Sequence, residues 1–131
     1  MPDATPGVIE LSAMCLQQPE SVMEYPFGPE ARVFKVHAKM FAIVPESANV
    51  ASISLKCDPD IAALLRQTYP AVTGGYHLSK KHWNTVVSNG TVADDDLRAW
   101  IEDSYDLVVA SLPKLIRLRL QGEVNVIDEP T

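Results

Sequence analysis

Bases, aromatic rings and amides are concentrated between residues 76 and 86, a segment that leads into an expected strand. Lysines can neutralise phosphates, an asparagine amide can donate and accept hydrogen bonds, and a Trp or His ring can stack on a base. One more lysine stands at the expected tip of an earlier hairpin. We therefore take five residues as candidates for contact with nucleic acid: Lys39, Lys80, Lys81, His82 and Asn84. The alternative is structural, with Trp83 anchored in the core and the lysines keeping a turn solvated.

Catalytic and metal-binding patterns are not found in this sequence. It contains no GxSxG, HExxH, GxGxxG or P-loop pattern, and the SxxK spelling at 111–114 lacks the companion elements of penicillin-binding enzymes. His37, His77 and His82 do not combine with the two cysteines at metal-ligand spacing. We expect a protein that is not an enzyme and that holds no metal or cofactor.

The cysteines and the apolar runs bear on where the chain works. Cys15 and Cys57 stand far apart without a CxxC pattern, which favours free, buried thiols. No run approaches the roughly 20 apolar residues of a membrane span, and the first seven residues do not resemble a signal peptide. We expect a cytoplasmic protein with no membrane contact.

Charge is distributed unevenly along the chain, whose net charge is -6. Residues 1–31 and 94–131 each carry a net charge of -5, whereas residues 32–93 carry +4. The overall charge argues against non-specific attraction to nucleic acid, while the basic central block could form one positive face or a set of scattered, solvated lysines.

Three helices are expected from apolar spacing. The first covers Val8–Leu16. The second begins after Asp58, whose side chain can cap it, and runs to about Thr68. The third and longest opens at residues 94–96, three aspartates of which the first can cap the helix, and its apolar stripe continues to Leu115 with Pro113 as a kink or restart.

The strands are expected from β-branched and aromatic runs. Residues 33–44 predict a hairpin with its tip at 37–39, and residues 50–56 alternate between an apolar and a polar face. After the strand at 83–88, the Asn-Gly pair at 89–90 predicts a tight turn with residues 91–92 pairing back. We expect one domain over 1–131, with its core at about 8–119 and a tail at 122–131.

Several short motifs resemble those of the MmcQ/YjbR family. They are Tyr-His-Leu at 76–78, Lys-His-Trp-Asn-Thr at 81–85 and Ser-Tyr-Asp-Leu-Val at 104–108, joined by Tyr-Pro-Phe-Gly at 25–28, Lys-Met-Phe at 39–41 and Leu-Pro-Lys at 112–114. The resemblance covers about residues 8–119. It implies an α+β fold, a two-layer sandwich of α-β(3)-α-β(2)-α order with helices packed on one antiparallel sheet.

The resemblance also suggests a function, because members of this family are described as DNA-binding on the strength of a double-wing motif. The implied activity is weak, salt-sensitive DNA binding in a non-enzymatic, regulatory role. The likeness of this fold to secretion-chaperone domains leaves an alternative, a cytoplasmic adaptor that binds a protein or peptide without nucleic-acid activity. Salt separates the two, since binding through lysines weakens steeply with salt and an apolar peptide site barely responds.

Overall fold

The computed structural model describes residues 5–75 and 78–122 of the chain. The predicted tail at 122–131 therefore lies outside the described residues from position 123 on, as do Tyr76 and His77. In chain order, the elements are α1 (Val8–Leu16), β1 (Ser21–Glu24), β2 (Ala31–Val36), β3 (Lys39–Pro45), β4 (Ser52–Lys56), α2 (Pro59–Thr68), β5 (Val72–Gly74), β6 (Trp83–Val87), α3 (Asp94–Val109) and α4 (Lys114–Leu120).

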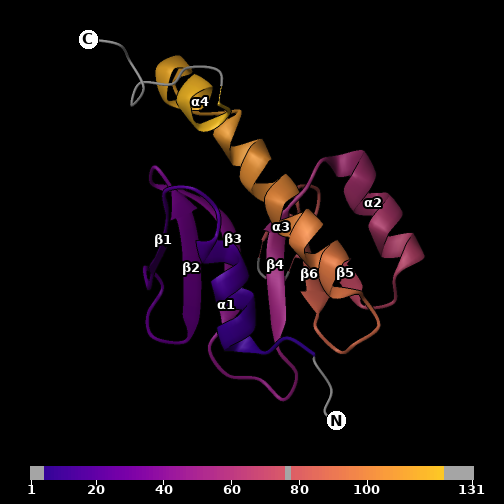
Figure 1. Cartoon of the computed structure of the whole chain (residues 1–131). Helices are drawn as coiled ribbons and strands as arrows, with labels where there is room; N and C mark the ends of the chain where they lie inside the picture. The colour runs from indigo at the N-terminus through magenta and orange to yellow at the C-terminus, as the bar shows by residue number, and fades with distance from the viewer. Residues whose placement is uncertain (1–4, 76–77, 123–131) are drawn as a thin grey trace.

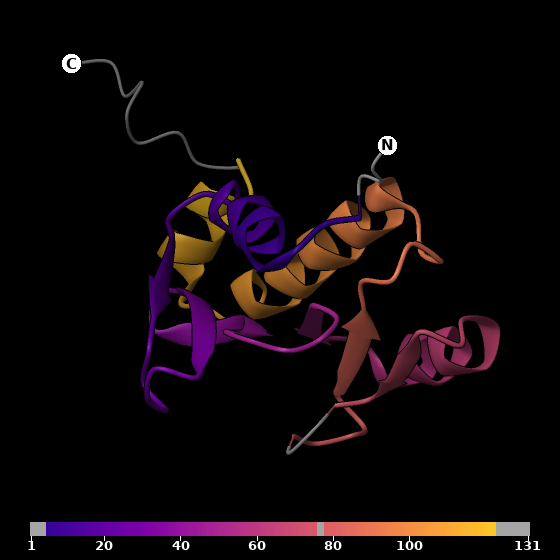
Figure 2. The same cartoon turned by 90° about the horizontal axis from the view of Figure 1, so that it is seen from below.

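The described strands form one antiparallel sheet in the order β1-β2-β3-β4-β6-β5, with helices packed on it (Figure 1). Seen from below, α1, α3 and α4 lie on one side of the sheet, and α2 lies near β5 and β6 (Figure 2). The α+β class and the helix-on-sheet arrangement expected from sequence are confirmed. The expected order missed the short strand β1, and the chain restarts after Pro113 as the separate helix α4.

The core lies between the sheet and the helices. Phe34, Phe41, Leu97 and Ile101 are fully buried there, and the ring of Phe41 meets Tyr105 of α3 edge-on at 5.5 Å between centroids. Pairing of β2 with β3 shifts beside Phe41, because Phe34 faces Ala42 while the next residue of β2 faces Met40. An extra residue of this kind is a β-bulge, which bends the strand and re-aims its side chains.

An aspartate cap was predicted for the first residues of both α2 and α3, and only the cap of α2 is confirmed. Asp58 caps α2, its Oδ1 accepting from the backbone N of Asp60 at 3.0 Å, as the Asp-Pro pair predicts. The expected cap by Asp94 is wrong, since Ala93 occupies the cap position of α3 and Asp94 is the first residue inside the helix. The three aspartates still fill the first turn, where the helix dipole favours negative charge.

The hairpin expected around Asn89 and Gly90 is also wrong. Asn89 Oδ1 accepts from the backbone N of Thr91 at 3.1 Å and from its hydroxyl at 2.6 Å, so the side chain closes a local turn in place of a strand ladder. Gly90 has a φ of 88°, a left-handed conformation that suits glycine. The partner of β6 at this edge is the preceding strand β5, with Thr73 opposite Thr85.

Two further expectations on the strands are confirmed in part. The hairpin of β2 and β3 turns at His37 and Ala38, both with positive φ. β4 alternates, but Ser54 on its expected wet face is only 7% exposed.

Within residues 5–75 and 78–122, no helix has the length and apolarity needed to span a bilayer.

Candidate nucleic-acid interface and the open-face cleft

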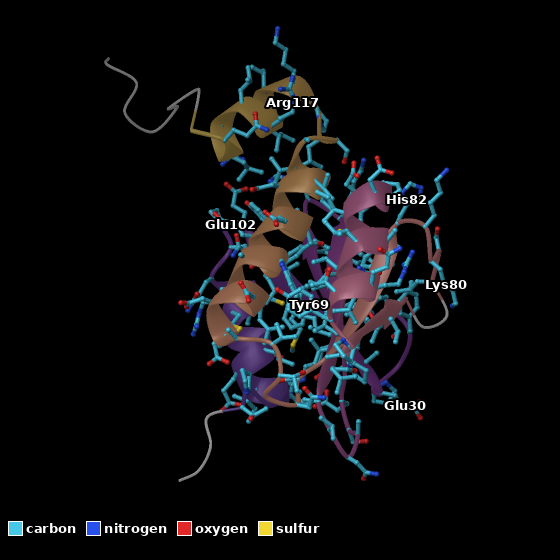
Figure 3. The ribbon with its side chains drawn as sticks, turned by 90° about the vertical axis from the view of Figure 1, so that its right-hand side faces the viewer. Glu30, Tyr69, Lys80, His82, Glu102 and Arg117 are labelled. Carbon is cyan, nitrogen blue, oxygen red and sulfur yellow. The ribbon has the colours of Figure 1, made fainter. Side chains whose placement is uncertain are left out.

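Three of the five candidate residues form one surface segment. Lys80, Lys81 and His82 are consecutive and exposed, directly before β6. Lys80 Nζ donates to the carbonyl of Gly75 at 3.0 Å, so this ammonium is tied to its own loop, whereas Lys81 and His82 extend from it. Lys80 and His82 lie on the side of the molecule away from α3 (Figure 3). We call residues 80–82 the basic segment.

Arg66 of α2 holds the basic segment in position. Its Nη1 donates to the carbonyl of Lys80 at 2.8 Å and to Oδ1 of Asn84 at 2.8 Å. One guanidinium therefore links a helix, a loop and a strand, which preorganises the loop because a planar donor with fixed geometry loses little freedom. Sequence reasoning missed this residue, since an isolated arginine in an amphipathic helix looks like a solvated charge.

Asn84 is not available at the surface. Its side chain is 2% exposed, and Nδ2 donates to the carbonyl of Ala62 in α2 at 3.3 Å. The expectation that Asn84 projects freely at a strand entry is therefore wrong. Strand alternation explains the error: Asn84 pairs with the core residue Leu55, and directly opposite residues share one face of the sheet, here the face under the helices.

Lys39 lies apart from the basic segment. Its Nζ donates to the hydroxyl of Ser111 at 3.2 Å and to the carbonyl of the same residue at 3.4 Å, in the turn between α3 and α4. Lys39 is opposite Val36, a buried residue of the helix-covered side. The structure thus brings together Lys80, Lys81 and His82 at the surface, places Lys39 elsewhere, and buries Asn84 against α2.

A cleft of about 700 Å³ occupies the face of the sheet that the helices leave uncovered. We call it the open-face cleft. Its lining includes Phe27, Ile43, Ser54, Thr73, Leu78 and Thr85. These residues come from β3, β4, β5 and β6 and from the segments before β2 and before the basic segment.

The cleft combines apolar rims with a hydroxyl-bearing floor. Phe27 is 66% exposed at one rim, and Leu78, two residues before Lys80, stands at the other. On the floor, the hydroxyls of Ser54 and Thr85 are 2.8 Å apart on paired positions of β4 and β6. Sequence reasoning missed Phe27, although an aromatic residue in a Tyr-Pro-Phe-Gly turn is a sign of an exposed ring.

Trp83 supports the loop that carries the basic segment. It is 8% exposed, as the structural interpretation of this residue predicts, and the backbone N of Gly75 donates to its carbonyl at 2.8 Å. A Cβ at Gly75 would lie 2.7 Å from the Cβ of Trp83, closer than such atoms approach. Glycine is therefore required for this close packing.

The metal-ligating side chains of the described residues lie dispersed, and burial affects both cysteines. Across residues 5–75 and 78–122, no group of three or more His, Cys, Asp or Glu side chains could hold a metal ion. Burial raises the pKa of the Cys15 thiol to about 12, and burial together with Asp58 and Asp103 raises that of Cys57. Both thiols thus hold their protons at neutral pH, which makes them poor nucleophiles.

Comparison with known sequences gives one family model and several relatives. The family model described as YjbR matches residues 16–107. Two relatives from Escherichia coli have names of uncharacterized proteins: YbdF of strain O157:H7, 39% identical over 82% of this chain and 88% of its own length, and YjbR of strain K12, 34% identical over 82% and 91%.

Two solved structures are also similar to this chain. The crystal structure of DR2400 from Deinococcus radiodurans, described as a DUF419 domain, matches with a TM-score of 0.82 and 34% identity over 97% of this chain and 96% of that one. A protein from Pseudomonas syringae matches with a TM-score of 0.63 and 27% identity over 72% of this chain and 92% of that one.

Proposed function

We propose that this chain, which belongs to the YjbR family, is a non-enzymatic DNA-binding protein that contacts its ligand through the basic segment and the open-face cleft. The family assignment expected from short motifs is confirmed by the match over residues 16–107. The relatives' names give no activity, so we infer the function from the geometry of this chain.

The observation that carries the proposal is a run of exposed bases shortly after Leu78, a residue that lines the open-face cleft. Lys81 and His82 are exposed, and they follow Leu78 in the same loop after Ser79 and Lys80. Phosphates attract such side chains without regard to sequence, and a ring such as Phe27 can stack on an unpaired base. Hydroxyls on the cleft floor suit sugar and phosphate oxygens. Lys56, opposite Trp83 on β4, adds a cation next to the segment.

A non-enzymatic role is supported by the state of the nucleophilic residues. Ser104, inside the longest helix, is fully buried, and the pKa values of both thiols are raised. Cys15 and Cys57 are free, which suits a reducing compartment and supports our placing the protein in the cytoplasm.

The first test is binding of duplex DNA, single-stranded DNA and RNA at increasing salt. If Lys56, Lys80 and Lys81 neutralise about three phosphates, the slope of log K against log salt is about -3 for a duplex and about -2 for a single strand. Affinity for a duplex then falls about 40-fold between 50 and 200 mM salt. No binding by the wild type at 50 mM salt, to any of the three ligands, rejects the proposal.

Charge reversal locates the contact. The variant Lys80→Glu/Lys81→Glu should lower DNA affinity at least about tenfold, because two attractions become repulsions. The matched control is Lys39→Glu/Arg98→Glu, in which Arg98 is an exposed residue of α3. It makes the same change in net charge on the helix-covered side and should retain most of the affinity. Equal losses in the two variants point to overall charge and reject the basic segment as the contact.

The second candidate is a protein- or peptide-binding adaptor, favoured by one observation, the 66% exposure of Phe27 beside a cleft with mainly apolar rims. In that case Phe27→Ala removes binding of a peptide selected against the protein, and Lys80→Glu/Lys81→Glu leaves it intact. Binding that barely changes with salt further separates this candidate from the first.

A further inference from the structure

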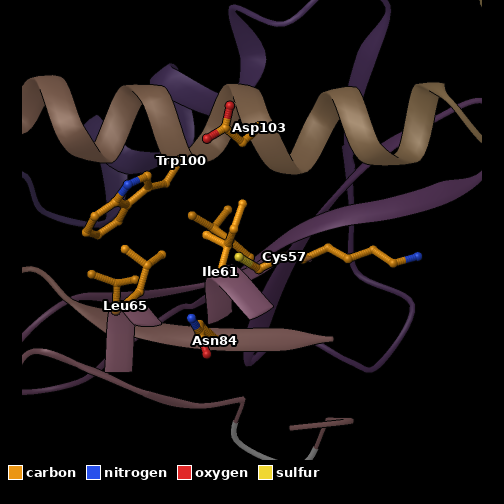
Figure 4. A pocket seen from close by; sticks show the side chains of 9 residues that line it. Cys57, Ile61, Leu65, Asn84, Trp100 and Asp103 are labelled. Atoms are coloured by element: carbon orange, nitrogen blue, oxygen red, sulfur yellow. The ribbon is translucent and has the colours of Figure 1, made fainter. Parts of the chain in front are cut away.

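A groove runs between α2 and α3, on the helix-covered side of the molecule. It consists of two adjoining cavities of about 60 and 330 Å³ that share Cys57, Ile61 and Asp103. Ile61 and Leu65 enter it from α2, and Trp100 and Asp103 from α3 (Figure 4). We call it the α2–α3 groove, and it reaches Leu107 and Ala110 at the end of α3.

The α2–α3 groove exposes apolar side chains. Ile61 is 51% exposed and Leu107 is 40% exposed, on opposite walls. Leu64, one turn beyond Ile61, is 59% exposed. Neighbouring apolar side chains left in water on two helices are typical of a surface that another chain covers.

Carboxylates surround this apolar strip. Asp58, Asp103 and Asp106 line the groove, and no ion pair involves any of them within the described residues. Burial, then Glu102 and Asp103, raises the pKa of Asp106, so this carboxylate is both partly desolvated and repelled by its neighbours. A partner that brings positive charge to the rim relieves that repulsion.

The acidic rim of the groove determines which of two segments of this sequence could cover it, residues 123–131 or helix α4. Residues 123–131 contain Glu123, Asp128 and Glu129 without any base, so their charge opposes contact with the groove. Helix α4 carries Lys114, Arg117 and Arg119 without any acid, and its Leu115 is 74% exposed. Of the two, only α4 has both the apolar side chain and the charge that the groove lacks.

The α4 of the same chain is held elsewhere. Ile116 and Leu120 pack against the core, and Arg119 pairs with Glu20, the residue directly before β1. Lys114 and Arg117 form no ion pair within the described residues. Figure 1 shows α4 beyond the end of α3. The side of α4 that carries Leu115 therefore remains exposed to solvent in the single chain.

We propose that a second copy of this chain inserts the exposed side of its α4 into the α2–α3 groove, and that the contact is reciprocal, giving a two-fold dimer. The groove ends at Ala110 and α4 begins at Lys114, so a two-fold axis beside residues 110–114 brings each α4 to the groove of its partner. Leu115 covers Ile61 and Leu107, while Lys114 and Arg117 meet the carboxylates of the rim.

Sedimentation velocity across the micromolar range tests the dimer. The wild type should pass from monomer to dimer as its concentration rises. Leu115→Asp, a change at an exposed position, should weaken association at least about tenfold, because it places a negative charge against apolar side chains that carboxylates surround. A wild type that stays monomeric throughout the range overturns the proposal.

Two charge-reversed variants give a sharper test. Lys114→Glu/Arg117→Glu sets an acidic α4 against an acidic groove, and Asp103→Lys/Asp106→Lys sets a basic groove against a basic α4, so each alone should be monomeric. Mixed in equal amounts, they should form a heterodimer, because both of its contacts then join opposite charges. Absence of a heterodimer from two folded variants rejects this interface.

A third variant separates the dimer from DNA binding. Lys80→Glu/Lys81→Glu changes two residues that do not line the α2–α3 groove, so this variant should dimerise like the wild type. Truncation after Gly122 should also leave the dimer intact, whereas loss of association in that protein assigns the contact to residues 123–131 and overturns the role of α4.

Discussion

Ser104 shows how one side chain determines the local geometry of the sheet. Its hydroxyl donates to the carbonyl of Phe41 at 2.6 Å and accepts from the backbone N of Lys56 at 2.9 Å. The β3–β4 ladder has pairs at Ala42 and Ile43 only, so the serine of α3 bridges the strands directly beyond those pairs. The helical pattern predicts that Ser104 faces the core, which is confirmed, but a bond to two strands depends on tertiary structure.

We expect Ser104→Ala to lower the free energy of unfolding by about 2–4 kcal/mol, because a buried N–H and a buried carbonyl both lose their partner. Denaturant melts measure this loss, with Ser79→Ala as a control at an exposed serine that should change stability by less than about 0.5 kcal/mol. A loss in Ser104→Ala no larger than in the control contradicts the bridging role. No covalent adduct should form at Ser104 with an acyl or phosphonyl probe.

Glu20 joins two distant parts of the chain by charge. Its carboxylate accepts from both Nη atoms of Arg119 and contacts His37 Nε2 at 2.7 Å. The hydrogen bonds from Arg119 and then His37 lower the pKa of Glu20 from its usual 4.5 to about 2. A pKa lowered by folding adds stability above the unfolded value, and this stability disappears as pH falls toward the folded value.

Glu20→Gln should therefore destabilise the protein near pH 6 and make little difference near pH 2. The expected loss is about 1 kcal/mol or less, since the Glu20 side chain is 39% exposed and water screens the pair. Melts of both proteins at several pH values measure the difference. A gap between the two that does not narrow between about pH 4.5 and 2 shows that the charge of Glu20 is not its cause.

Helix ends were the most predictable elements, because their chemistry is local. The range Val8–Leu16 and the end of α2 at Thr68 before Tyr69-Pro70 follow from apolar spacing and from the restriction before proline. The assignment of Asp94 as a cap failed by one residue, since an aspartate inside the first turn and one at the cap look alike in a run of three.

Asp58→Ala should cost about 1 kcal/mol, because the backbone N of Asp60 loses its acceptor. Asp94→Ala is a matched control at a first-turn aspartate that makes no cap, and only its favourable position on the helix dipole is lost, about 0.3–0.5 kcal/mol. Equal costs in denaturant melts mean that the cap adds nothing beyond charge.

Strands were less predictable, because pairing is set by partners distant in sequence. β1 has only four residues, Ser21–Glu24, and β5 only three, too few to show alternation. The Asn-Gly pair at 89–90 is the strongest short sign of a hairpin, yet Asn89 closes the turn with its own side chain. No short stretch of the sequence shows that β6 pairs with the preceding strand β5.

The same limit applies to the candidate site. Lys80, Lys81 and His82 were predicted together and lie together because they are contiguous. Alternation separates Trp83 from Asn84 on opposite faces of β6 but does not tell which face the helices cover. The open-face cleft is built from segments that are distant in sequence, so its existence depended on topology.

At the scale of the whole molecule, the single helical layer produces two different surfaces. The helix-covered side carries the α2–α3 groove with its carboxylates, and the uncovered side carries the basic segment and the open-face cleft. A net charge of -6 is therefore compatible with one local basic region, because the carboxylates of the groove and the bases of residues 80–82 belong to different parts of the surface.

Cys15 offers a measure of how the whole molecule opens. Its side chain is fully buried in the core, and burial raises the pKa of its thiol to about 12. Cys57, in contrast, is half-buried and lines the α2–α3 groove. In a Cys57→Ser variant, a thiol reagent should label Cys15 at least about 1,000-fold more slowly than an unfolded peptide, since access requires unfolding of a domain stable by about 5 kcal/mol or more.

The dependence on denaturant decides whether that opening is global. If Cys15 reacts only in the unfolded chain, the logarithm of its labelling rate rises with denaturant at the slope of the equilibrium unfolding transition. Cys57, tested in a Cys15→Ala variant, should react faster in the native protein and with a smaller slope. A shallow slope for Cys15 indicates that α1 detaches from the sheet before the rest of the core unfolds, and contradicts the prediction of one cooperative unit.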